Sequence, residues 1–144
     1  MEMSTMGKVI VTAKLINLQD LYVAQCGFRP ADQVRSVEVT DAMADTGATS
    51  LMAPRRVIAQ LGLRPFRTRQ ARTCAGPIAL QFYEAVRLVV QGREFTCDVA
   101  EVPDDCPVLI GQIPLEGLDF VVDPQRPRLI GNPAHGGEHM VEAF

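Results

Sequence analysis

The feature of this sequence that most constrains its fold and chemistry is the stretch of residues 42–50, Ala-Met-Ala-Asp-Thr-Gly-Ala-Thr-Ser. An apolar run leads into a single carboxylate, Asp45, and the residues that follow are small, so another group can approach that carboxylate closely. Thr46 can hydrogen-bond within the turn, and Gly47 allows backbone conformations that other residues resist. A carboxylate at the end of a buried strand is costly unless other groups hold it, which indicates a reactive site.

Composition narrows the class of protein. The chain has 144 residues, of which 47% are hydrophobic, enough for one domain with a substantial core. A formal net charge of −3 disfavours a nucleic-acid binder, so we interpret the arginines at 55–56 and between 64 and 72 as solvated faces. The four cysteines lie far apart, which argues against a disulfide framework or a zinc knuckle.

The sequence shows no signal for a membrane. No apolar run approaches the ~20 residues of a membrane span, and the first residues show no signal-peptide pattern. We therefore expect a reduced, cytoplasmic protein.

The hydrophobic pattern predicts a mostly β domain with one or two short helices. β-branched and alternating runs predict many short strands, and Pro54 and Gly62 bracket a predicted helix. The predicted strands cover residues 8–18 with a short continuation at 21–24, then 37–45, 64–73, 78–90, 95–99, 107–111, 120–122 and 128–130. The predicted helices cover residues 54–61 and 113–118. We assign residues 1–131 to a single domain and residues 132–144 to a loose C-terminal tail.

Three motifs occur in an order that resembles a known family. The first is the loop at residues 42–48, the second is the turn Thr-Cys-Ala-Gly-Pro-Ile at 73–78, and the third is the strand Val-Leu-Ile-Gly at 108–111. In this order they resemble the retropepsin-like aspartic proteases of clan AA, single-domain relatives of pepsin that include retroviral proteases and bacterial homologues. The resemblance extends over roughly residues 37–130.

The resemblance implies a pepsin-like closed β-barrel of the retropepsin type. It implies that Asp45 is catalytic, that Thr46 and Gly47 support its loop, and that the strand at 108–111 passes beside that loop. The residues that it implies for substrate contact are Gly47 and Ala48 in the loop and Cys74, Ala75 and Gly76 in the turn, which takes the place of the flap tip. Such a protease needs no metal and no cofactor.

The chemistry of this family needs two neighbouring carboxylates, of which one stays protonated because like charges a few ångströms apart cannot both ionise comfortably. The chain contains one Asp-Thr-Gly sequence and no Asp-Ser-Gly, and it is too short for two pepsin-like lobes. We therefore expect the second carboxylate to come from a second copy across a two-fold axis. The function that follows is a homodimeric aspartic endopeptidase, whose partners are its own copy and a peptide or protein substrate, without nucleic acid or membrane.

A catalytically inactive module with the same fold, which binds a peptide or serves in dimerisation, is the alternative. Such proteases often pair an acidic residue near the catalytic loop with an arginine after the second glycine, and those places hold Thr49 and Gln112 here. The turn at 73–78 also has fewer glycines than retroviral flaps. Both departures favour the alternative.

A third pattern, His-x-x-Glu-His from His135 to His139, matches an inverted zinc-protease motif. Zinc binding there needs both histidines on one helical face. The adjacent glycines at 136 and 137 disfavour that helix, so we predict no metal site.

Overall fold

The computed structural model describes residues 8–141 and 143. It confirms a mostly β fold, with three α-helices where one or two were expected. The strands are β1 (Lys8–Asn17), β2 (Ser36–Asp45), β3 (Leu51–Pro54), β4 (Pro65–Thr73), β5 (Gly76–Val90), β6 (Arg93–Val102), β7 (Leu109–Ile110), β8 (Phe120–Val122) and β9 (Leu129–Gly131). The helices are α1 (Leu18–Gln25), α2 (Arg55–Leu61) and α3 (Gln112–Leu118), with single 3₁₀ turns η1 (Ala31–Gln33) and η2 (Pro133–His135).

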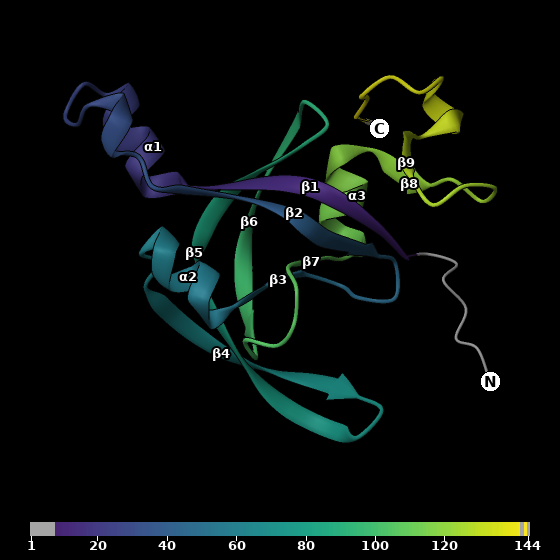
Figure 1. Ribbon diagram of the computed structural model, residues 1–144, viewed down its shortest axis with the longest axis horizontal. Coiled ribbons are helices and arrows are strands. Elements are labelled where there is room, and N and C mark those ends of the chain that lie inside the picture. The colour runs from purple at the N-terminus through teal and green to yellow at the C-terminus, as the bar shows by residue number, and fades with distance from the viewer. Residues whose placement is uncertain (1–7, 142, 144) are drawn as a thin grey trace.

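The main sheet closes on itself. Its strand order is β1-β2-β7-β3-β6-β5-β4, and a further pairing of β1 with β5 joins the two sides into a ring that leaves β4 outside (Figure 1). The enclosed side chains are almost all aliphatic, as expected for strands whose alternate residues point inward. They include Leu15, Ala42, Ala44, Leu51, Val86, Leu88, Val99 and Ile110, each at most 1% exposed.

The region after β1 corrects a prediction, because residues 21–24 lie in helix α1 and do not continue the strand. Asn17 is the N-cap of this helix, and its side chain accepts a hydrogen bond from the Asp20 backbone N–H at 3.0 Å. The Asn17 amide also donates to the Leu61 carbonyl at the end of α2, at 2.8 Å. The strand therefore ends at Asn17, where this cap begins the helix. The β-branched composition of the preceding residues favoured a longer strand and hid this boundary.

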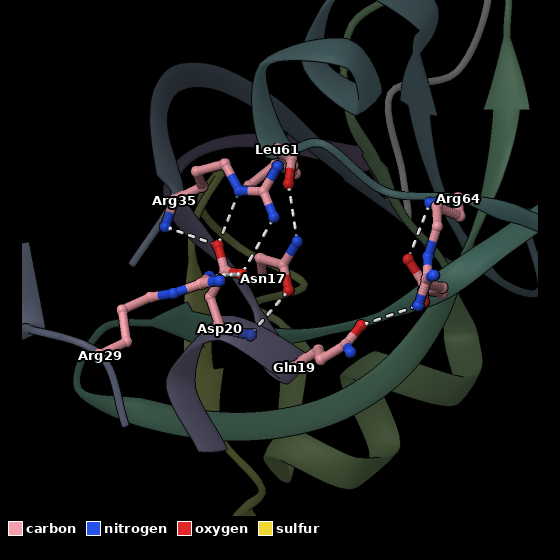
Figure 2. A network of polar contacts seen from close by, with 8 residues as sticks. Asn17, Gln19, Asp20, Arg29, Arg35, Leu61 and Arg64 are labelled. Carbon is pink, nitrogen blue, oxygen red and sulfur yellow. Dashed lines mark hydrogen bonds and ion pairs between the residues drawn. The ribbon is translucent and has the colours of Figure 1, made fainter. Parts of the chain in front are cut away.

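A buried ion-pair network holds α1 against the sheet (Figure 2). Asp20 is 2% exposed, and its two carboxylate oxygens accept from the Arg35 guanidinium at 2.7 and 3.0 Å. The Arg35 backbone N–H and the Arg29 side chain donate to the same carboxylate. The pKa of Asp20 falls from 3.8 to about 2, chiefly because of the hydrogen bonds from the Arg35 side chain.

Helix α2 confirms the prediction for residues 54–61. Pro54 is its N-cap, and Gly62 at its C-terminus adopts a left-handed conformation with φ of +64°. A Cβ at Gly62 would lie 1.9 Å from the Arg35 guanidinium, so this glycine also makes room for the buried network.

The C-terminal segment packs against the domain, and the expectation of a loose tail is wrong for its described part. Asp119, 5% exposed, accepts hydrogen bonds from Asn132 and from the Met140 backbone N–H, and its carboxylate lies 2.8 Å from Nδ1 of His135. Arg93 donates to the Gly137 carbonyl. The buried carboxylate of Asp119 thus binds this segment, and the spacing of residues in the sequence does not predict these contacts. The boundary at residue 131 stays a prediction.

The described residues contain no group of three or more His, Cys, Asp or Glu side chains that could hold a metal ion. In the same part of the chain, no helix is long and apolar enough to cross a membrane.

Candidate active site

Strand β2 delivers Asp45 to the surface. Ala42 and Ala44 are fully buried, while Met43 and Asp45 point to the opposite face of the strand and are partly exposed. This alternation follows from the period of two in a β-strand. The carboxylate therefore lies at the end of a strand whose other face is fixed in the core, and it is accessible from outside.

The loop after Asp45 holds that carboxylate in one orientation. The Gly47 N–H donates to Oδ1 of Asp45 at 2.8 Å, and the Ala48 N–H donates to the Asp45 carbonyl at 3.0 Å. A Cβ at Gly47 would lie 3.2 Å from the same Oδ1, so a larger residue would crowd the carboxylate. The loop is a tight turn of small residues whose backbone binds the acid, as the sequence indicated.

Strand β7 passes between β2 and β3, directly beside this loop. Ala44 pairs with Ile110 in parallel, and Ile110 pairs with Leu51 in antiparallel orientation. The Gly111 N–H donates to the Ser50 carbonyl at 3.1 Å. A Cβ at Gly111 would lie 2.5 Å from a backbone carbon of Thr49, so the crossing requires glycine. The expectation that the strand at 108–111 passes beside the loop is confirmed.

The loop is bound to helix α3 by backbone groups. The Gln112 N–H donates to the Ala48 carbonyl at 2.8 Å, and the Ile113 N–H donates to the Thr49 carbonyl at 3.0 Å. The Gln112 side chain donates to Glu116 of its own helix at 2.9 Å. Main-chain hydrogen bonds thus fix the loop to the start of α3, and the Gln112 side chain contacts its own helix.

The β4–β5 hairpin extends from the ring as an arm (Figure 1). Its tip is residues 73–76, where the Thr73 hydroxyl donates to the Gly76 carbonyl at 2.7 Å and accepts from the Ala75 N–H. Gly76 has φ of +112°, a conformation that favours glycine, and Cys74 is exposed.

A row of side chains runs across the sheet on the side that carries Asp45, with Ala100 fully buried at its centre, and sequence analysis missed it. Residues directly paired in neighbouring strands point to the same side of a sheet. The pairings Met43–Leu109, Leu109–Met52, Met52–Ala100, Ala100–Phe82 and Phe82–Arg67 define this outer row. The adjacent row on the other face, Ala44, Ile110, Leu51 and Val99, lies in the core. Alternation of side chains along each strand was visible in the sequence. It could not show which residues of different strands lie side by side, because that depends on the register of the strands.

The site defines a class of protein: a ring of strands with one acidic loop, a strand crossing beside it and a hairpin arm is the arrangement of a single-domain aspartic protease. Comparison with known families agrees, because the sequence profile of a family described as aspartyl protease matches residues 33–131. The chain therefore belongs to this retropepsin-like aspartyl protease family. A search of curated proteins found no match. Strand β1 and helix α1 lie before the matched region.

Proposed function

We propose that this protein is a homodimeric aspartic endopeptidase in which Asp45 of each subunit contributes one of two catalytic carboxylates. The observation that supports this most strongly is the partly exposed Asp45, held by its own loop at the crossing of β7 between β2 and β3. Membership of the aspartyl protease family supports the general activity. Among the described residues, no other carboxylate is hydrogen-bonded to Asp45, and the two-fold axis of a dimer supplies the missing one.

In the proposed mechanism the two carboxylates share one proton. The ionised carboxylate takes a proton from water, and the protonated one donates a hydrogen bond to the scissile carbonyl as that water attacks it. The backbone N–H of Gly47 keeps the Asp45 carboxylate in place throughout, because it already donates to Oδ1. Thr46, exposed beside Asp45, is the residue that we assign to contacts between the two loops across the axis.

The substrate binds in an extended conformation in this proposal, in the manner of an added β-strand. Gly47 and Ala48 present a backbone surface without bulky side chains beside the carboxylate. The arm tip, Cys74, Ala75 and Gly76, covers the substrate from the other side, and its exposure in the single chain leaves it free to do so.

The test compares Asp45→Asn with the wild-type protein in a peptide-library cleavage assay combined with measurement of mass in solution. We expect Asp45→Asn to lose cleavage and to keep the dimer mass. Asp41→Asn is the matched control, because it removes the same charge from an exposed position on the same strand and should cleave normally. Undiminished cleavage by Asp45→Asn, or a wild-type protein that is monomeric and active, would contradict the proposal.

A non-catalytic peptide-binding module is the second candidate. One observation favours it: Thr49 and Gln112 replace the charged pair that the resemblance implies, and the Gln112 side chain contacts Glu116. The second candidate is supported if the wild-type protein and Asp45→Asn bind library peptides equally and the wild-type protein cleaves none of them between mildly acidic and neutral pH.

A further inference from the structure

The arm extends the face that carries Asp45. Arg67 pairs with Phe82 in the outer row, and the next pairs on the same side of the arm are Arg69 with Leu80 and Ala71 with Ile78. Phe82, Leu80 and Ile78 thus form an apolar stripe along β5, and Ile78 is 45% exposed. In Figure 1 the arm and the loop between β2 and β3 extend toward the same side of the molecule.

Two arginines flank this stripe. Strand β4 contains Arg67, Arg69 and Arg72 and no acidic residue, in a chain whose net charge is −3. Arg67 lies over the Phe66 ring and reaches Asp98 at 3.4 Å, a long and solvent-exposed ion pair. Among the described residues, the Arg69 side chain makes no ion pair and no hydrogen bond. An exposed guanidinium next to an apolar stripe, with no internal partner, is available for an external anion.

The alternation of β4 separates these arginines by face. Arg67 and Arg69 are two residues apart and lie on the side of the outer row, whereas Arg72 is three residues from Arg69 and lies on the opposite side of the arm. The arrangement is therefore not a uniformly basic hairpin. Among the described residues, one arginine side chain without a partner, Arg69, lies on the outer side of the sheet, which also carries Asp45, and another, Arg72, lies on the opposite side of the arm.

We propose that Arg69, assisted by Arg67, is a specificity-determining residue that selects substrates with an acidic side chain near a bulky apolar residue. This inference rests on the proposed function, since it describes the substrate of the same site. The stripe of Phe82, Leu80 and Ile78 contacts the apolar residue of the extended substrate. The Arg69 guanidinium pairs with an aspartate or glutamate on the same face of that strand, where side chains recur every second residue.

The experiment uses peptides with one common apolar centre and either Asp, Asn or Lys at flanking positions. Cleavage by the wild-type protein is measured as kcat/KM, and binding of the same peptides to full-length Asp45→Asn is measured by fluorescence anisotropy. We expect Asp peptides to exceed Asn peptides by about five-fold in both readouts, the range of an exposed ion pair, and to exceed Lys peptides further. High salt should reduce the preference because the pair is screened.

Arg69→Gln should abolish this preference, and Arg72→Gln should keep it. Arg72 is the matched control because it removes the same charge from the same exposed strand, on the opposite face. If proteins that keep Arg69 cleave and bind the Asp and Asn peptides equally, the inference is overturned. It is also overturned if Arg69→Gln and Arg72→Gln lose the preference for Asp peptides to the same extent.

The two readouts also separate the inference from the proposed function. Cleavage without acidic preference refutes only the inference. Binding with acidic preference and without cleavage by the wild-type protein refutes only the proposed activity, and the absence of binding and of cleavage refutes both.

Discussion

The buried ion pair between Asp20 and Arg35 gives a prediction whose magnitude follows from the structure. The Asp20 carboxylate is almost fully enclosed and accepts three hydrogen bonds from Arg35, one from the backbone and two from the guanidinium. Asp20→Asn keeps the size of the side chain and removes its charge. We expect this variant to fold and to be less stable, because the two arginines lose the anion that they surround.

The loss of stability can be worked out from the pKa of Asp20. A fall from 3.8 in the unfolded chain to about 2 in the folded protein corresponds to about 2 kcal/mol of stabilisation at pH 7. The folded-state pKa is the lower one, so this stability is present above pH 3.8 and is lost as the pH falls through 2. About 1 kcal/mol of this stabilisation remains at pH 3 by the same linkage.

The assay is urea unfolding of the wild-type protein and Asp20→Asn at pH 7 and at pH 3. The difference in free energy of unfolding between the two proteins should be about 2 kcal/mol at pH 7 and should narrow by about 1 kcal/mol at pH 3. Asp32→Asn, an exposed position in η1 near the same helix, is the control and should change little. A difference that stays constant between the two pH values would refute the assignment of the low pKa to Asp20.

Three further outcomes are expected. Gly111→Ala should destabilise the fold by about 1–3 kcal/mol in urea unfolding, because its Cβ meets the Thr49 backbone, and wild-type stability would contradict the crossing geometry. The double variant Thr49→Asp with Gln112→Arg should be more stable than the sum of the single variants by up to about 1 kcal/mol, and a double-mutant cycle without coupling would show that these positions do not meet. A maleimide should label the exposed Cys74 in the native protein and spare Cys97, because burial raises the pKa of the Cys97 thiol to about 12. Mass spectrometry of the digested protein locates the label, and labelling of Cys97 in preference to Cys74 would contradict this prediction.

The local geometry around Asp45 followed most directly from the sequence, whereas its catalytic role stays a prediction. Asp45, its small neighbours and the glycine at 111 are contiguous local motifs, and each is required by a close approach that only small residues allow. Glu84 interrupts the apolar pattern of β5 at a register shift between Tyr83 and Val86, where it pairs with Arg64. Local chemistry thus determined local structure.

Long-range partners were the part that sequence could not supply. The carboxylates of Asp20 and Asp119 are buried because arginine, histidine or backbone groups reach them from 9 to 21 positions away, and composition does not show which carboxylate finds such partners. The outer row depends in the same way on strand register, which aligns Met43 with Phe82 across three intervening strands. The helix at 18–25 was missed because one capping side chain, Asn17, overrides the strand propensity of the run.

The most direct test of a shared active site is to mix wild-type protein with increasing amounts of Asp45→Asn and to measure cleavage per wild-type chain after subunit exchange. If each active centre needs Asp45 from both subunits, mixed dimers are inactive, and activity per wild-type chain falls toward zero as the variant comes into excess. Asp41→Asn added in the same amounts should cause no such fall. Activity per wild-type chain that is unchanged by excess Asp45→Asn would contradict the account.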